Sequence, residues 1–170
     1  MRYVLMTLIF STLLTGCTFE KQDMQQDKTL INQLVDDWHA AAADADFESY
    51  FSYFADDGTF IGTDPTENWD IESFRIWSKP FFDRGQAWSF KAVERNIYFS
   101  ESGKTAWFDE LLNTQMKICR GSRVLEKADG DWKIWHYVLS MTVPNENTQE
   151  VVEIKSVIED GILSEIYRKQ

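Results

Sequence analysis

Cysteine and histidine are scarce in this chain of 170 residues, which contains two of each. The histidines, His39 and His136, are far apart, and neither lies at a spacing from a cysteine or another histidine that is typical of zinc sites. We therefore expect neither a bound metal nor a cofactor. No repeat, low-complexity segment or second core is visible, so we expect one globular domain.

Basic residues are also few. Lysine and arginine total 17 against 28 aspartate and glutamate residues, which gives a formal net charge of -11. A nucleic-acid-binding surface needs clustered basic side chains, and this sequence has no such cluster. The acidic residues are scattered, which favours a solvated surface over an acidic interaction tail. We therefore expect no nucleic acid among the partners.

Long apolar runs are rare as well, and the most distinct one opens the chain. Arg2 precedes the apolar run 3–10, which Leu13 and Leu14 extend. A membrane-spanning helix needs about 20 apolar residues, so this run is too short to cross a bilayer comfortably. A basic residue, a short apolar core and small residues after it are typical of a secretion signal.

The end of this segment, Leu14-Thr15-Gly16-Cys17, resembles the lipobox of bacterial lipoproteins. The resemblance implies a signal peptide at residues 1–16, cleavage before Cys17 and acylation of that cysteine. It also implies a bacterial cell-envelope location, facing the periplasm or the exterior, with the lipid bilayer as a partner. Residues 17–27 are polar and aperiodic, so we expect a lipidated tether there. The alternative is an ordinary signal peptide followed by a chance cysteine.

Acylation of Cys17 would leave Cys119 as the one remaining thiol, so no intramolecular disulfide could form. Cys119 stands between Ile118 and Arg120 in a predicted strand. Because free cysteine behaves as a small apolar residue, we expect a buried structural thiol rather than a nucleophile.

The segment 28–144 carries the pattern of a folded domain. Apolar residues at three- and four-residue steps predict a helix over 29–42. His39 falls between these apolar positions, so we expect it at a solvated edge. A second helix is predicted over 46–54, with Asp46 as its N-cap.

A short strand is predicted at 59–62, and the residues after it have the pattern of a helix start. Asp64 can accept from free backbone amides, Pro65 suits the first helical position, and Glu67 can reach back to the amide of Asp64. A further helix is predicted over 71–82 from its apolar spacing.

The second half of the domain predicts strands, because it is rich in aromatic and β-branched residues between turn signals. The predicted strands are 87–99, 104–116, 118–127 and 131–142. Helices followed by consecutive hairpins predict an α+β fold, with helices on one face of a curved antiparallel sheet. Residues 145–170 predict an amphipathic C-terminal helix, which could cover the outer face of the sheet or join a dimer.

The predicted strand 131–142 is apolar on both faces. Side chains alternate along a strand, so one face carries Trp132 and His136 and forms the predicted wall of a pocket. The other face carries Trp135 and Tyr137 and would be an exposed apolar patch without a cover. A homodimer through the outer face of the sheet would supply that cover.

Several fragments stand in a familiar order along the chain. They are Phe60–Asp64 with Glu67 and Trp69, then Ala106–Glu110, Arg120–Ser122 and Trp132–Ser140. In this order they resemble the SnoaL-like branch of the nuclear transport factor two-like superfamily. The resemblance implies a cone, in which a strongly bent antiparallel sheet wraps around the N-terminal helices and encloses a cavity. Members often dimerise through the outer sheet face. They include isomerases, dehydratases, epoxide hydrolases, polyketide cyclases and binding-only domains, so fold alone assigns no chemistry.

Catalytic members place carboxylates inside the cone, which implies Glu110, Asp109 and His136 as catalytic candidates. Glu110 and Asp109 lie on opposite faces of their strand, and both faces are largely apolar, so either can point inward. A cross-strand ion pair of Glu110 with Arg120 is an alternative to proton transfer. The predicted ligand pocket consists of Trp69, Trp107, Glu110, Arg120, Trp132 and His136.

Three functions from different classes follow from these observations. The favoured one is an exported, membrane-anchored protein whose cone binds a small amphipathic molecule. The second is an acid–base isomerase, dehydratase or cyclase that uses Glu110 or Asp109 as the base, with His136 or Arg120 steadying an oxyanion. The third is a non-catalytic assembly protein with a filled cone. A structure distinguishes them by the contents of the cone.

Overall fold

The structure is a computed structural model that describes the backbone of residues 14–170 and the side chains of residues 24–170. The signal peptide predicted at 1–16 and the side chain of the lipidation candidate Cys17 therefore lie outside the described residues. Two compact units make up the chain, Met1–Ser140 and Met141–Gln170.

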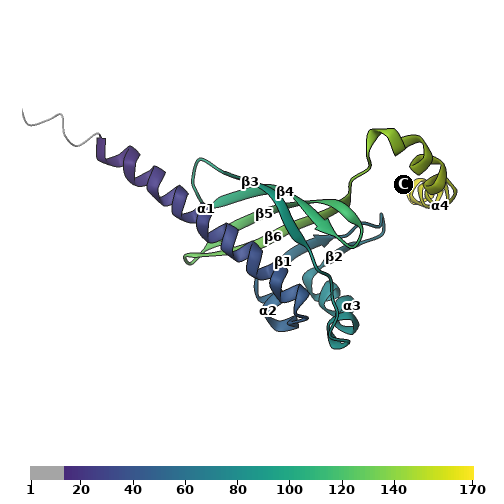
Figure 1. The fold of residues 1–170 in the computed structure, drawn as a ribbon, viewed down its shortest axis with the longest axis horizontal. Helices are drawn as coiled ribbons and strands as arrows, with labels where there is room; N and C mark the ends of the chain where they lie inside the picture. The colour runs from purple at the N-terminus through teal and green to yellow at the C-terminus, as the bar shows by residue number, and fades with distance from the viewer. Residues whose placement is uncertain (1–13) are drawn as a thin grey trace, which may run out of the picture. The chain divides into compact units, whose positions relative to one another are not determined.

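The described part of the first unit, from residue 14 on, contains three helices and six strands, coloured from purple to green in Figure 1. Its elements are α1 (Leu14–Ala43), α2 (Phe47–Ser52), β1 (Phe54–Ile61), β2 (Asn68–Asp70), α3 (Ile71–Asp83), β3 (Lys91–Phe99), β4 (Thr105–Thr114), β5 (Lys117–Ala128) and β6 (Asp131–Met141). The predicted α+β class is confirmed.

The six strands form one curved sheet in the order β2-β1-β6-β5-β4-β3 (Figure 1). The pairs β1/β2, β3/β4 and β4/β5 are antiparallel, but β1 runs parallel to β6. The sheet is therefore mixed rather than purely antiparallel. The chain from β2 to β5, including α3, lies between β1 and β6 and is long enough for β6 to return parallel to β1.

The core lies between the N-terminal helices and the inner face of the sheet. The helix α1 contributes Ile31, Val35 and Trp38, all fully buried. These residues follow three- and four-residue steps, as the apolar spacing predicts. Aromatic rings from α2, α3 and the sheet complete the core. Cys119 is a buried free thiol there, which confirms its predicted burial.

The segment 17–27, expected as an aperiodic tether, belongs to α1 in this structure. Its Asp27 is only 7% exposed and accepts from Lys127 Nζ at 2.7 Å and Trp132 Nε1 at 3.1 Å. Polar residues such as glutamate, lysine and glutamine are good helix formers, so polar composition alone did not exclude a helix.

The predicted helix start at Asp64 is wrong, because residues 62–67 form the loop between β1 and β2. The expected side-chain bond is nevertheless present, since the carboxylate of Glu67 accepts from the Asp64 amide at 3.2 Å. Pairing of Ile61 with Asn68 closes the loop as a hairpin. Cross-strand pairing, which the local motif does not encode, therefore overrides the helix signal.

The turn before β6 agrees with the prediction. Asp129 and Gly130 both have positive φ, 53° and 96°. Such values at both central residues of a two-residue hairpin fit the right-handed twist of the flanking strands, and Asp-Gly is a preferred pair for them.

The alternation along β6 shifts by one residue in its middle. Trp132 and Ile134 are buried, but so are Tyr137 and Leu139, while His136 is only half-buried. The expected inward position of His136 is therefore wrong, and Tyr137 takes the inner place. The register of β1 against β6 is also irregular between Phe54 and Thr59, so strict alternation fails where these strands bend.

The second unit contains a short 3-10 turn, η1 (Asn145–Asn147), and the helix α4 (Thr148–Arg168). The predicted C-terminal helix is confirmed, and none of its residues is buried. Among the described residues, no helix is both long enough and apolar enough to cross a membrane.

Candidate functional site

A buried charge cluster centred on Glu110 lies at the middle of the domain. Glu110 is 1% exposed and projects inward from β4. Its Oε1 accepts from Arg123 Nη1 at 2.8 Å and from His39 Nε2 at 2.9 Å. Its Oε2 accepts from Arg95 at 3.0 Å. The cluster therefore joins α1, β3, β4 and β5 through one carboxylate.

The two arginines of the cluster have different surroundings. Arg95 also contacts Asp36 at 2.9 Å and the backbone and side-chain oxygens of Asn32 at 3.2 Å, so it ties β3 to α1. Arg123 is 1% exposed, and its guanidinium lies 4.1 Å from the ring centroid of Trp38 and 4.3 Å from that of Tyr137. Aromatic faces and one carboxylate thus replace the water around a fully buried cation.

Proton affinities in the cluster follow from these contacts. Burial by itself raises the pKa of Glu110, but Arg123, His39 and Arg95 outweigh it and lower that pKa to about 2. Burial lowers the pKa of His39 more than the hydrogen bond to Glu110 raises it. His39 is therefore neutral near pH 7, and since a carboxylate only accepts, its Nε2 carries the proton and its Nδ1 a free lone pair.

Several predicted site residues lie elsewhere. Glu110 points to the inner face of the sheet, whereas Asp109 and Arg120 point to the outer face. Trp107 is also on the outer face and is 45% exposed. Glu110 lies opposite Gly121, not Arg120, and its ion pairs go to Arg95 and Arg123 instead. The expected Glu110–Arg120 pair is therefore wrong.

Two other predicted pocket residues lie at opposite ends of the domain. Trp132 is buried beside Asp27, to which its indole donates. Trp69 lines an aromatic slot at the far end of the sheet. The six predicted residues therefore do not form one pocket.

The aromatic slot is a small cavity of about 150 Å³ between β1, β2, α3 and the segment after α3. Six aromatic side chains line it, with Thr63, Glu67 and Gln115 among its polar groups. The aromatic residues are Phe60, Trp69, Phe74, Trp77, Trp88 and Phe90. Several rings are nearly parallel: Phe60 and Phe74 stack at 3.9 Å and 14°, and Trp69 and Phe74 at 5.5 Å and 25°.

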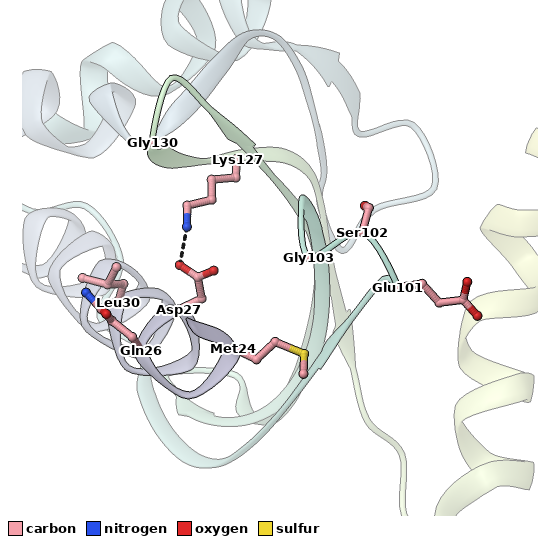
Figure 2. Close-up of a pocket in the computed structure, with 9 residues that line it drawn as sticks. All are labelled: Met24, Gln26, Asp27, Leu30, Glu101, Ser102, Gly103, Lys127 and Gly130. Atoms are coloured by element: carbon pink, nitrogen blue, oxygen red, sulfur yellow. Dashed lines mark hydrogen bonds and ion pairs between the residues drawn. The ribbon is translucent and has the colours of Figure 1, made fainter. Parts of the chain in front are cut away.

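A larger hollow of about 490 Å³ lies at the opposite end, between α1 and the turns that follow β3 and β5. Figure 2 shows its lining, with the Lys127–Asp27 ion pair bridging α1 and β5. Because Lys127 and Asp27 pair with each other, neither charge is left unpaired for a ligand. Leu30 and Met24 are the large apolar side chains of the wall. Size alone therefore does not make it the better site, because it has few convergent groups that would orient a ligand.

Sequence reasoning missed His39, Arg123, Arg95 and Tyr137. A signal for two of them was present. His39 follows Val35 by four residues and so borders the apolar stripe of α1. Arg123 is four residues from Cys119, so a buried Cys119 places it inward and Arg120 outward.

Comparison with known proteins agrees with this architecture. The family model of the SnoaL-like domain matches residues 31–144. Among curated proteins, none matches the chain. An NTF2-like protein of unknown function from Pseudomonas putida KT2440 is 15% identical, with a TM-score of 0.62 over 72% of this chain and 92% of that one.

Two other similar solved structures carry provisional enzyme names. One is provisionally named a dehydratase of the NTF2-like family, from Streptomyces avermitilis, with 15% identity and a TM-score of 0.59 over 71% of this chain and 99% of its own. The other is provisionally named a scytalone dehydratase, from Novosphingobium aromaticivorans, with 15% identity and a TM-score of 0.60 over 72% and 89%. At this identity the likeness shows the fold alone. Because the family model covers most of the described fold, the chain belongs to the SnoaL-like domain family.

Proposed function

We propose that this chain is an exported lipoprotein whose SnoaL-like domain binds a small, planar, largely apolar molecule in the aromatic slot. The observation that carries the proposal is the near-parallel arrangement of the slot's rings. Parallel rings favour a flat guest, because stacking needs ring faces aligned. A cavity of about 150 Å³ favours a guest of one or two rings.

The polar groups of the slot favour a ligand that is amphipathic rather than purely apolar. Thr63, Glu67 and Gln115 all belong to loops and lie exposed or half-buried beside the rings. A few polar groups in an apolar pocket commonly fix the orientation of a ligand. We therefore expect the ligand to carry at least one polar substituent.

Acid–base catalysis is the second candidate, and His39 supports it better than Glu110. A carboxylate with a pKa of about 2 is a weak base near neutral pH, so Glu110 is unsuited to proton abstraction. His39 is neutral and held by Glu110, and its Nδ1 has no partner among the described residues. An oriented imidazole with a free nitrogen is a suitable general base. Loss of turnover in His39→Gln with retained ligand binding would favour this second function.

The binding proposal is tested with two exposed tryptophans. Trp77 lines the slot and is 41% exposed, while Trp107 lies on the outer sheet face and is 45% exposed. Titration of indole, followed by ligand-observed NMR, should show binding to the wild type that Trp77→Ala weakens by roughly 3- to 10-fold. Trp107→Ala is the matched control and should leave the affinity unchanged. Equal effects of both variants, or no binding to the wild type, would refute the slot as a binding site.

Membrane anchoring is supported by the Leu14-Thr15-Gly16-Cys17 sequence alone. A Cys17→Ser variant should move the protein from the membrane fraction to the soluble fraction of the cell envelope, because a serine hydroxyl is not the thiol that is acylated. Persistence in the membrane fraction would contradict the lipoprotein assignment. Immunoblotting of fractionated cells measures the outcome.

A homodimer through the outer sheet face is part of the same proposal. Tyr98 and Trp107 stack there at 6.1 Å, and Trp135 is also exposed on this unit. Exposed aromatic residues close together favour an interface. Trp107→Lys should shift the mass measured by light scattering from dimer to monomer. A monomeric wild type would end this part of the proposal.

A further inference from the structure

Several buried polar atoms of the cone interior lack a hydrogen-bond partner among the described residues. Four of them are Trp38 Nε1, His39 Nδ1 and the hydroxyls of Tyr50 and Tyr137. Trp88 lies close enough to the Tyr50 hydroxyl, and Arg123 to the Tyr137 hydroxyl, to lower the pKa of each, but neither contact has the geometry of a formed hydrogen bond. A buried polar group without a partner costs about 1 to 3 kcal/mol, so four such groups in one small domain call for an explanation.

These groups lie close together in the cone. The ring of Trp38 stacks on Tyr50 at 4.8 Å and meets Tyr137 edge-on at 5.2 Å. His39 is the next residue of α1, with its ring 5.0 Å from that of Trp38. All four side chains are at least nine-tenths buried. They form an inner polar layer next to the charge cluster.

The inner polar layer lies directly behind the aromatic slot. Trp88 lines the slot and contacts the ring of Tyr50 at 5.5 Å. Phe90 also lines the slot and contacts the ring of His39 at 5.9 Å. Two more lining rings, Phe60 and Phe74, contact Tyr137 at 5.0 Å and Tyr50 at 6.3 Å. Of these four separating side chains, only Trp88 and Phe90 belong to a segment outside the helices and strands.

That segment, residues 84–90, is weakly fixed. It forms neither helix nor strand. Residues 86–90 make no backbone–backbone hydrogen bond with any other described residue. Gly85, at its start, has a φ of +69°, which glycine adopts without strain. Side-chain packing of Ala87, Trp88 and Phe90 against the core holds residues 86–90, so a shift of the two rings breaks no backbone ladder.

We propose that the inner polar layer is a subsite for the oxygen substituent of the slot's ligand, reached when segment 84–90 moves Trp88 and Phe90 aside. The proposal rests on ligand binding in the slot. The hydroxyls of Tyr50 and Tyr137 donate hydrogen bonds to the ligand oxygen, and His39 Nδ1 accepts a hydrogen bond from the ligand hydroxyl. The ligand class is a phenol, since one planar ring fills the slot and one hydroxyl satisfies both kinds of partner.

Phenol and toluene test the subsite, because they have the same shape and differ by one hydroxyl. Ligand-observed NMR titration of the wild type should show tighter binding of phenol. Tyr50→Phe and Tyr137→Phe should each weaken phenol binding by roughly 2- to 10-fold and leave toluene unchanged. Equal binding of both probes, or an unchanged preference in both variants, would overturn the subsite while leaving the slot intact. If neither probe binds the wild type, the slot is overturned as well.

The movement of segment 84–90 has a separate test that needs no ligand. N-acetylimidazole acetylates accessible tyrosine hydroxyls, and peptide mass spectrometry locates the product. Trp88→Ala should make Tyr50 react several-fold faster, while Ser89→Ala, an exposed position on the same segment, should not. Modification of the buried thiol Cys119 reports global unfolding, so Tyr50 must gain reactivity while Cys119 stays protected. Continued protection of Tyr50 in Trp88→Ala would overturn the role of the segment.

Discussion

The charge cluster and the aromatic slot lie in the same domain, but the carboxylate of the cluster is fully paired by other side chains, whereas the slot is open. Each oxygen of Glu110 has an arginine partner, and Glu110, Arg123 and Arg95 join three strands to α1. The slot is a cavity of about 150 Å³ lined by six aromatic side chains, with polar groups only in its loops. The fully paired carboxylate of Glu110 has no oxygen left to bind a ligand, whereas the slot has open space for one. Ionisable residues deep in a cone are therefore not by themselves a catalytic site.

The largest expected effect is the loss of the negative charge at the centre of the cluster. Glu110→Gln keeps the shape of the side chain but leaves Arg123 with no carboxylate partner at 1% exposure. Breaking a buried ion pair costs about 3 to 5 kcal/mol of the free energy of unfolding. Urea unfolding followed by circular dichroism measures this loss.

The neighbouring acid supplies the matched control. Asp109→Asn changes the same charge one residue away on the opposite face of β4, where the side chain is only half-buried. Surface substitutions usually change the free energy of unfolding by less than about 0.5 kcal/mol. Equal losses in the two variants would show that the cluster does not hold the fold together.

The parts of the site that sequence could predict are those where alternation is regular. On β4 it is unbroken, so the row with Glu110 is buried and that with Asp109 is not. On β6 it shifts between Ile134 and Tyr137, so His136 is placed wrongly. A bend of this kind depends on contacts with β1, which no local pattern encodes.

Contacts between residues far apart in the sequence likewise could not be predicted from local sequence patterns. His39 and Glu110 are 71 positions apart, and their 2.9 Å contact exists only once α1 lies against the sheet. The aromatic slot was predicted only through Trp69, because its other rings come from separate elements. The α+β class needed only element order and apolar spacing, and it was predictable.

The second effect, in order of size, is the pH dependence of the cluster. The pKa of Glu110 falls from 4.5 to about 2 on folding. A lowered carboxyl pKa contributes stability that is fully present above the unfolded value and is lost as pH falls through the folded value. The wild type should therefore lose about 3 kcal/mol between pH 5 and pH 2 through this group.

Comparison with Glu110→Gln isolates that contribution, because the variant lacks the titrating group. The stability gap between wild type and variant should narrow by that amount as pH falls from 5 to 2, measured by urea unfolding at each pH. His39 also has a lowered pKa on folding, and Glu110 raises that pKa, so His39 titrates differently in the two proteins. The comparison is therefore made with His39→Gln present in both proteins, which removes the second titrating group. A gap that stays constant across this window would mean that Glu110 is not stabilised as a carboxylate.

The smallest expected effect concerns the inner polar layer, which lies between the charge cluster and the aromatic slot. Here the substitution should raise the free energy of unfolding rather than lower it. Tyr50 is fully buried and its hydroxyl has no partner among the described residues. Tyr50→Phe removes that unpaired group and keeps the ring against Trp38, so the ligand-free protein should become more stable, by about 1 kcal/mol. Thermal unfolding without and with phenol separates the two roles of the hydroxyl: the variant should melt higher alone but gain less from phenol. A lower melting temperature in the free variant would mean that the hydroxyl is already satisfied, and the inner polar layer would then belong with the saturated cluster.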